Sequence, residues 1–458
     1  MHRTVVLNVV GLTNELLAHA PNLQRLARHG WHRPLRTITP AVTCSVQSTF
    51  TTGLLPDAHG CVANGWYFRD LAEVWLWRQS NALVTGEKIW DAAKKRDPSF
   101  TSAKLFWWYN MYSSAQFAVT PRPLYPADGR KIPDIYTEPA LLRDELFAAL
   151  GPFPLFHFWG PRADILSSEW IAASAQRVYD EKTPTLSLVY LPHLDYNLQR
   201  LGPKHPAIAD DVKAVDKVAG ELIAHVEKDG TRVVVLSEYA ITEVTGAIHI
   251  NRALREAGWL KVRLELGEEK LDAGGSEAFA VSDHQIAHVY VKNPARVPEV
   301  LRLVADLPGV ATVLDEEGKR RAGLHHPRSG EIVAIAKSDR WFTYYFWLDD
   351  AKAPDYARTV DIHRKPGYDP VELFVDPKLV LPALKIGKKL AQKALGFRML
   401  LDVVSLDASL VKGSHGRPTD RIEDGPIFIS SEPSLVPIDR PAVDATDVKA
   451  LVLSHLFD

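Results

Sequence analysis

Cysteine, methionine and long hydrophobic runs are all scarce in this chain. Its 458 residues include two cysteines, Cys44 and Cys61, and three methionines. Two cysteines cannot form a disulfide framework, and such usage is typical of a reducing compartment, so we expect a cytoplasmic protein. The chain has no run of about 18 apolar residues, which is the length needed to span a membrane. The N-terminus passes at once into an apolar run and lacks a signal-peptide cleavage pattern.

An excess of charge of either sign is also missing. The chain has 54 basic and 56 acidic side chains, which are well mixed and give a net charge of −2. We therefore expect neither a nucleic-acid partner nor a membrane partner. A hydrophobic content of 46% and a charged content of 24% are typical of a globular chain, long enough for one large α/β domain with insertions or for two domains. The sequence does not indicate an oligomeric state.

The stretch from Pro40 to Asn64 concentrates hydroxyl side chains next to turn residues. Its hydroxyl-bearing side chains are Thr43, Ser45, Ser48, Thr49, Thr51 and Thr52. A hydroxyl between a turn and a helix lies near free backbone N–H groups and the positive end of the helix dipole. It can attack a phosphorus atom that those amides hold. Alternatively, these side chains only cap the helix and face solvent, which is a common role.

The spacing within this stretch carries a resemblance to a known family. A threonine is followed ten residues later by a glycine, then by P-x-x-H-G and an asparagine; these are Thr43, Gly53, Pro56, His59, Gly60 and Asn64. The pattern resembles the nucleophile segment of the nucleotide pyrophosphatase/phosphodiesterases, which belong to the alkaline phosphatase superfamily. The resemblance implies that Thr43 is the nucleophile, that Asn64 binds phosphate, and that the substrate is a small phosphate-containing molecule.

Three apolar runs rich in β-branched residues predict buried parallel strands, and each leads into a loop. They are Thr4–Gly11, Thr185–Leu191 and Arg232–Leu236, and the helices predicted around them are Pro21–Gly30, Ala140–Leu150, Trp170–Asp180 and Ala207–Lys228. Ligands of such sheets bind beyond the carboxyl ends of the strands, so we expect the site at one common edge. Together with the resemblance, this predicts an α/β fold, an alkaline-phosphatase-like sandwich with a mainly parallel central sheet, helices on both faces and inserted segments.

The remaining stretches predict how the chain is divided. We expect residues 1–277 to form the first part of the core, with an aromatic-rich insertion at 66–180, residues 278–346 to form an inserted small α+β subdomain, and residues 347–458 to complete the core. The insertion holds eight of the twelve tryptophans. These rings either fill the core or wall a pocket for apolar or planar ligands. The basic, periodic stretch Pro382–Leu395 predicts a surface helix.

The resemblance implies two zinc ions at the sheet edge, but this chain keeps only part of the ligand set. One pocket would retain Asp195 and His415, with Gln199 in place of a histidine. The other would retain Thr43 and Glu238. There, Val10 stands where an aspartate is expected and Tyr239 where a histidine is expected. Valine offers zinc no ligand and neutral tyrosine offers little. We therefore expect one divalent ion or none.

Other residues could compensate for the lost ligands. His363 and His284 are the best placed along the sequence, although each could equally be a histidine with only a local hydrogen bond. Tyr239 could act as a base or hydrogen-bond donor toward Thr43, with Glu238 orienting it.

The sequence favours a hydrolase of phosphodiester, pyrophosphate or phosphomonoester bonds with a threonine nucleophile and a modified metal site. One alternative is a relative that binds phosphate ligands without turnover. Another is a phosphonate hydrolase or phosphotransferase, because the superfamily shares one fold across these reactions.

Overall fold

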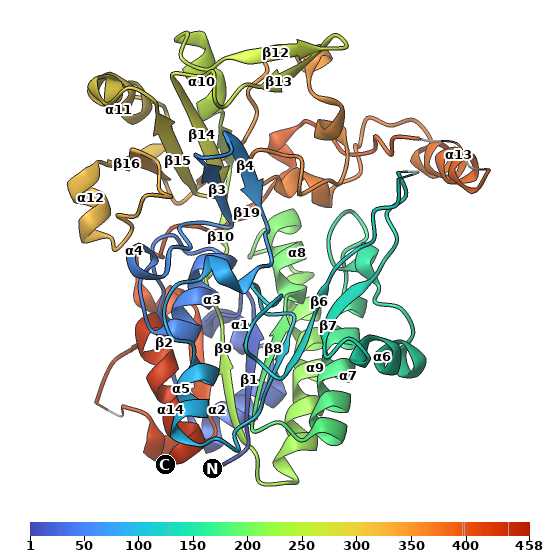
Figure 1. Cartoon of the computed structure of the whole chain (residues 1–458), viewed down its shortest axis with the longest axis vertical. Helices are drawn as coiled ribbons and strands as arrows, with labels where there is room; N and C mark the ends of the chain where they lie inside the picture. The colour runs from blue at the N-terminus through green and yellow to red at the C-terminus, as the bar shows by residue number, and fades with distance from the viewer. Residues whose placement is uncertain (128, 396, 398, 438) are drawn as a thin grey trace.

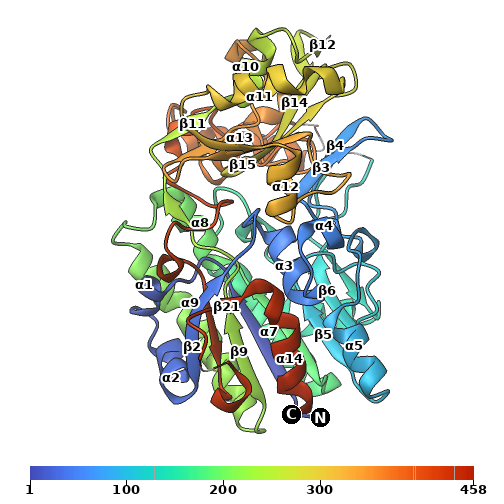
Figure 2. The same cartoon turned by 90° about the vertical axis from the view of Figure 1, so that its left-hand side faces the viewer.

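The molecule has two regions, each built around its own β-sheet (Figure 1). The computed structural model describes residues 1–127, 129–395, 397, 399–437 and 439–458. The larger region contains a nine-stranded sheet and both chain termini, and the smaller contains a four-stranded sheet (Figure 2).

The central sheet is mainly parallel, as the sequence predicts. Its order is β21-β2-β20-β9-β1-β8-β5-β6-β7, and the five strands from β9 to β6 run parallel. The strands are β1 Thr4–Val9, β2 Trp31–Arg36, β5 Ser102–Leu105, β6 Phe117–Pro121, β7 Ile135–Glu138, β8 Leu186–Leu191, β9 Arg232–Leu236, β20 Ile427–Ser430 and β21 Val443–Asp444. The antiparallel strands β20 and β7 flank the parallel block.

The three strands predicted from apolar runs lie side by side at the centre. Strand β1 pairs with β8 on one side and with β9 on the other. Val9 lies opposite Leu191, and Asn8 lies opposite Leu236, so the three strands end at nearly the same level. All three strands are almost wholly buried, which explains their continuous apolar runs. The residues that follow them therefore meet at one edge of the sheet.

Helices cover both faces of this sheet (Figure 2). One face carries α2 Pro21–His29, α6 Leu142–Leu150, α7 Leu166–Lys182, α8 His193–Leu201 and α9 Ile208–Glu227, and the other carries α3 Thr43–Thr52, α5 Ile89–Arg96 and α14 Val448–Phe457. Two short helices, α1 Asn14–Leu17 and α4 Pro56–His59, lie in connections. Helix α8 contradicts the prediction that the strand ending at Leu191 leads into a loop.

Residues 66–180 contribute more to the core than the predicted insertion implied. Strands β5, β6 and β7 come from this stretch and form one side of the central sheet. Each has only four or five residues, too few to show a clear hydrophobic period beside so many aromatic residues. Strands β3 Gly65–Phe68 and β4 Glu73–Leu76 pair with each other as a hairpin that is not part of the central sheet.

The smaller region contains an antiparallel sheet of order β14-β15-β17-β16. Its elements are β14 Ala278–Asp283, β15 Ile286–Val291, β16 Val310–Leu314, β17 Ile332–Ala336, α10 Ile250–Glu256, α11 Val297–Ala305 and α12 Glu316–Arg321. Three two-stranded ribbons complete the strands: β10 Thr242–Glu243 with β19 Gly413–Ser414, β11 Gly246–Ile248 with β18 Arg340–Phe342, and β12 Val262–Glu265 with β13 Glu268–Leu271. The division at residues 277 and 346 stays a prediction.

The predicted basic helix is α13 Pro382–Ala394, which stands out from one side of the molecule (Figure 1). In the described part of the chain, no helix is both long and apolar enough to cross a membrane.

Candidate active site

Thr43 is the first residue of helix α3, at the edge where the central strands end. The preceding residue, Val42, is extended, and Gly53 ends the helix in the left-handed conformation with φ 72°. The Cys44 N–H donates to Asn64 Oδ1 at 2.9 Å, which satisfies one of the free amides of the first turn. Asn64 is therefore placed beside Thr43 as a helix cap. The Thr43 side chain lines a large cavity.

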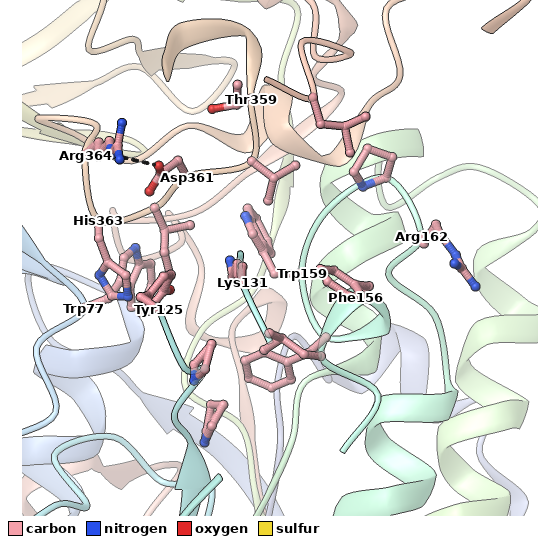
Figure 3. A pocket seen from close by; sticks show the side chains of 18 of the residues that line it. Trp77, Tyr125, Lys131, Phe156, Trp159, Arg162, Thr359, Asp361, His363 and Arg364 are labelled. Atoms are coloured by element: carbon pink, nitrogen blue, oxygen red, sulfur yellow. Dashed lines mark ion pairs between the residues drawn. The ribbon is translucent and has the colours of Figure 1, made fainter. Parts of the chain in front are cut away.

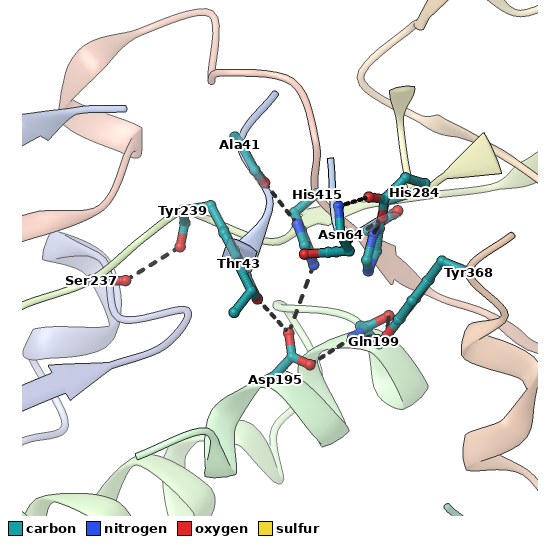
Figure 4. A network of polar contacts seen from close by, with 12 residues as sticks. Ala41, Thr43, Asn64, Asp195, Gln199, Ser237, Tyr239, His284, Tyr368 and His415 are labelled. Atoms are coloured by element: carbon teal, nitrogen blue, oxygen red, sulfur yellow. Dashed lines mark hydrogen bonds and ion pairs between the residues drawn. The ribbon is translucent and has the colours of Figure 1, made fainter. Parts of the chain in front are cut away.

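A chain of hydroxyl and carboxyl groups runs from Thr43 (Figure 4). Thr43 Oγ1 lies 3.0 Å from Tyr239 Oη. Tyr239 Oη in turn donates to Asp195 Oδ1 at 3.3 Å. Because the phenol has a single proton, Thr43 donates to Tyr239 when Tyr239 donates to Asp195. A proton can pass from the threonine to the carboxylate by this route.

The Asp195 carboxylate is buried and holds further contacts. It follows β8 on helix α8, and Gln199, one turn later, donates to its Oδ2 at 2.9 Å. Burial raises the pKa of Asp195 to about 7, although the hydrogen bonds from Tyr239 and Gln199 act in the opposite direction. His415 Nε2 lies 3.9 Å from Asp195 Oδ1. At neutral pH this carboxyl is therefore able both to accept and to release a proton.

Four rings stack beside the Asp195 carboxylate. Tyr239 lies on His415 with ring centroids 3.6 Å apart, and His415 lies on His284 at 3.7 Å. Tyr368 covers the other side of His284 at 3.6 Å. Burial holds the pKa values of His284 and His415 well below the usual value, so both imidazoles are neutral at pH 7. The stack fixes the plane of Tyr239, and so the direction in which its hydroxyl points.

Glu238, which directly precedes Tyr239, is fully buried among amide groups. Asn8 and Gln47 both donate to its Oε1, whereas Oε2 has no partner among the described residues. Burial raises the pKa of Glu238 to about 8, against the effect of the two amide donors. Because an unpartnered charge would be costly there, the neutral acid is favoured and Oε2 can carry the proton.

The smaller region contributes to the site through the tip of the β14–β15 hairpin. Asp283 accepts from the Asn64 backbone N–H at 2.8 Å and from the Asn64 side-chain amide at 3.1 Å. Asp283 Oδ1 also lies 2.7 Å from His284 Nδ1. His284 turns the hairpin with φ 62°, a backbone conformation that few non-glycine residues adopt. One carboxylate thus holds both the helix-capping asparagine and one ring of the stack.

Sequence reasoning missed three residues of this site. Asn8 and Gln47 bind Glu238, and Tyr368 ends the ring stack. Asn8 had a signal, because it is a single polar residue within an apolar strand. Gln47 and Tyr368 had none that stood out.

The residues of the site do not fit the zinc ions that the resemblance implies. In the Glu238 pocket, Val10 supplies no ligand atom, Tyr239 is a phenol, and amide donors occupy Glu238 Oε1. In the Asp195 pocket, Gln199 donates its amide to the carboxylate and accepts from Tyr368. Across the described residues, no three His, Cys, Asp or Glu side chains are arranged to hold a metal ion. The rings of His284 and His415 lie over one another, with centroids 3.7 Å apart and planes inclined by 36°, whereas two ligands of one zinc ion must both point toward it.

The site opens into a cavity of about 1580 Å³ (Figure 3). Thr43, Asp195, Tyr239, His284 and His415 lie on its wall, and so do the tryptophans Trp75, Trp77, Trp108 and Trp159. The sequence left open whether the aromatic residues of 66–180 fill the core or wall a pocket, and these four wall the cavity. Basic side chains also line it: Arg78, Arg122, Arg130, Lys131, Arg162 and Arg364.

His363 lies on this wall beside Trp77 (Figure 3). Burial lowers its pKa to about 4. Of the two histidines expected to compensate for lost ligands, His363 lies on the cavity wall, whereas His284 lies in the ring stack.

The fold is a mainly parallel sheet with helices on both faces. At the carboxyl edge of this sheet, a hydroxyl at the start of a helix faces a cavity. Together these features define the alkaline-phosphatase-like class of α/β proteins. The family model for type I phosphodiesterase/nucleotide pyrophosphatase matches residues 4–369. The chain belongs to this family of phosphoester hydrolases.

Individual proteins are similar to this chain at identities between 16% and 27%. An uncharacterised pyrophosphatase/phosphodiesterase of Schizosaccharomyces pombe is 27% identical over 233 residues, which cover 49% of this chain and 41% of that protein. Murine ectonucleotide pyrophosphatase/phosphodiesterase 5, as an inactive variant with AMP, has a TM-score of 0.60 at 16% identity, covering 100% of this chain and 95% of that one. Phosphonoacetate hydrolase of Sinorhizobium meliloti, with phosphonoacetate, has a TM-score of 0.63 at 16% identity, covering 99% and 96%. At this identity the two structures show a shared fold.

Proposed function

We propose that this protein hydrolyses phosphoesters with Thr43 as the nucleophile and Asp195 as the base, acting through Tyr239. The observation that supports this is the continuous contact from Thr43 to Tyr239 to Asp195. An unactivated threonine is a poor nucleophile, and a neighbouring base is one of the few means of activating it. The proposal takes no step through a metal ion, because the residues do not fit one.

The reaction proceeds in two steps. In the first, Thr43 Oγ1 bonds to phosphorus and the bond from phosphorus to the leaving oxygen breaks. The Thr43 proton moves to Tyr239 while the Tyr239 proton moves to Asp195, so that charge and atoms balance. In the second step, a water oxygen bonds to phosphorus and the bond from phosphorus to Thr43 Oγ1 breaks. The proton on Asp195 returns through Tyr239 to Thr43 Oγ1, and one proton of the water leaves with the phosphate or the released oxyanion.

Negative charge on the phosphoryl group needs donors in place of metal ions. The first turn of α3 offers backbone N–H groups and the positive end of its dipole. Glu238, when protonated on Oε2, adds a neutral donor next to Thr43. Asn64 has a second amide hydrogen besides the one given to Asp283.

The cavity bears on the part of the substrate beyond its phosphate. Its tryptophans suit a large planar or apolar group, and its arginines suit an anion. AMP and phosphonoacetate, the ligands named for the two structural relatives, are suitable first probes. The free, buried cysteines Cys44 and Cys61 support a reducing compartment, and with it the cytoplasm, as the location.

A second candidate is a phosphate-binding relative without turnover. The filled Glu238 pocket and the ring stack favour it, because both take up space that metal ions would need. Tight binding of AMP without hydrolysis, measured by calorimetry and phosphate release, would support this candidate instead.

The test of the hydrolase is a comparison of three variants on an aryl phosphodiester, whose leaving group needs no protonation. Thr43→Ala should lower kcat at least about a thousandfold, because the attacking atom is lost. Tyr239→Phe should lower kcat about a hundredfold or more, because the ring stack stays while the proton route is broken. Tyr179→Phe is the matched control, since Tyr179 is equally buried but its hydroxyl bonds to Thr231, away from the cavity. Unchanged turnover in Thr43→Ala would show that the nucleophile is another group.

A further inference from the structure

The segment from Val380 to Leu401 exposes apolar side chains in an unusual density. Leu384 is 68% exposed and Leu395 is 76% exposed, and the flanking residues Val380, Leu381, Phe397 and Leu400 are exposed as well. Single exposed leucines are common on protein surfaces, but contiguous groups of them mark interaction sites.

Helix α13 exposes several apolar side chains and turns part of its charge inward. On the inward side, Lys385 and Lys389 both pair with Asp402. Leu384, Ala391 and Leu395 are spaced seven and four residues apart, so they lie on one side of the helix, and all three are exposed. A helix packed on its own protein normally has the reverse arrangement.

The segment is also strongly basic. From Lys378 to Leu401 the sequence contains six basic residues and no acidic one: Lys378, Lys385, Lys388, Lys389, Lys393 and Arg398. Lys388 is exposed beside the leucines and has no ion-pair partner among the described residues. The net charge of −2 for the whole chain hides this local excess, which is why composition alone argued against a membrane partner.

The same segment forms part of the cavity wall. Ile386, Phe397, Met399, Leu400 and Leu401 line the cavity that contains Thr43. Phe397 and Leu400 are both exposed and on the cavity wall, so they lie at its mouth. Tyr125, 57% exposed on the loop after β6, also lines the cavity.

We propose that helix α13 and the exposed apolar residues beside it, Val380, Leu381, Leu395, Phe397 and Leu400, bind the surface of an anionic lipid bilayer, with α13 lying in the interface and the mouth of the cavity facing the membrane. An outward apolar face flanked by lysines is the pattern of interfacial helices, whose leucines enter the acyl boundary while their lysines meet acidic headgroups. A nucleic-acid surface would account for the lysines but not for a row of exposed leucines. This proposal does not depend on hydrolysis.

Co-sedimentation with vesicles tests the proposal on the full-length protein. We expect binding to phosphatidylcholine vesicles that contain phosphatidylglycerol, much weaker binding to phosphatidylcholine alone, and release by salt. The double variant Leu384→Ser, Leu395→Ser should lower the partition coefficient about tenfold or more, because each leucine buried in the interface contributes at least that scale of affinity. Lys388→Glu should weaken binding to the anionic vesicles only.

The matched control is Leu71→Ser, Leu264→Ser. These two leucines are 61% and 70% exposed, and neither lies on residues 380–401. Circular dichroism should be unchanged in all variants, since every substituted side chain is exposed. Equal binding of the two double variants, or no binding to the anionic vesicles, would overturn the proposal. One further result would overturn it: the natural protein is a dimer that does not bind vesicles, and Leu384→Ser, Leu395→Ser makes it monomeric whereas the control variant does not. The face would then join two copies of the chain.

Discussion

At the scale of single residues, two buried carboxyls set the chemistry of the site. Asp195 ends the contact chain from Thr43, and Glu238 is held by Asn8 and Gln47. Burial raises the pKa of Asp195 to about 7 and that of Glu238 to about 8. The two groups must be in opposite protonation states before the proposed reaction begins. Asp195 must be ionised so that it can accept a proton, and Glu238 must be protonated so that it can donate a hydrogen bond.

These pKa values predict a bell-shaped dependence of kcat/KM on pH. The rate should rise as pH rises through about 7, because Asp195 must be ionised to accept a proton, and fall above about 8, because Glu238 must stay protonated to donate. Glu238→Gln keeps a neutral donor at this position, so the falling limb should disappear while the rising limb stays. Steady-state rates on an aryl phosphodiester from pH 5 to 10 measure both limbs. A rising limb near the ordinary aspartate pKa would contradict the role given to Asp195.

At the scale of elements, the β14–β15 hairpin links the two regions of the molecule at the site. Its tip carries Asp283, which bonds to both the backbone and the side chain of Asn64. Asn64 in turn caps α3 through the Cys44 N–H. The hairpin therefore supports the helix start that presents Thr43, although it belongs to another sheet.

Asp283→Asn should damage stability and activity together. An asparagine of the same shape has one acceptor oxygen fewer, so a buried donor of Asn64 or His284 is left unpaired at a cost of about 1 to 3 kcal/mol. The melting temperature in calorimetry and kcat on the aryl phosphodiester should both fall. Asp210→Asn serves as the control, because that carboxylate is 80% exposed on α9 and, among the residues that the structure describes, forms an ion pair with Lys213 alone. Loss of stability without any loss of kcat would show that the hairpin does not support the site.

At the scale of the whole molecule, the chain keeps the family fold, and Val10, Gln199 and Tyr239 stand where the resemblance implies metal ligands. The family model covers residues 4–369, and the related structures cover nearly the entire chain. Around these positions, Asn8 and Gln47 donate to Glu238, and Gln199 donates to Tyr368. The side chains of Gln199 and Tyr239 are thus held by hydrogen bonds and stacked rings.

The metal content of the purified protein tests this description. We expect less than about one equivalent of zinc per chain after dialysis without chelator, because valine and phenol offer zinc almost nothing. The triple variant Val10→Asp, Glu238→Asp, Tyr239→His restores the ligand types of the second pocket and should raise the zinc content measured by elemental analysis. About two equivalents of zinc in the natural protein would mean that His284 and His415 leave their stack to bind metal.

The sequence by itself determined the central strands, the start of α3 and which side chains stand where the resemblance implies metal ligands. Each of these depends on neighbours along the chain: continuous β-branched runs for β1, β8 and β9, and the turn and glycine that bound the Thr43 helix. Local propensity and spacing are enough to specify such features. The short strands β5 to β7 and helix α8 escaped prediction, because a few residues without a clear period carry too little local information.

Only the tertiary structure decided how these parts become a site. Thr43 and Tyr239 are 196 positions apart, and Asn8 and Glu238 are 230 apart. Their contacts depend on β1 lying between β8 and β9, and on the hairpin of the second sheet reaching the first. The raised pKa values of Asp195 and Glu238 have the same origin, because they come from burial by segments distant in the chain. The sequence says which side chain stands at each position. Whether that side chain is shielded from water, and which groups it contacts, depends on how segments far apart in the chain pack together.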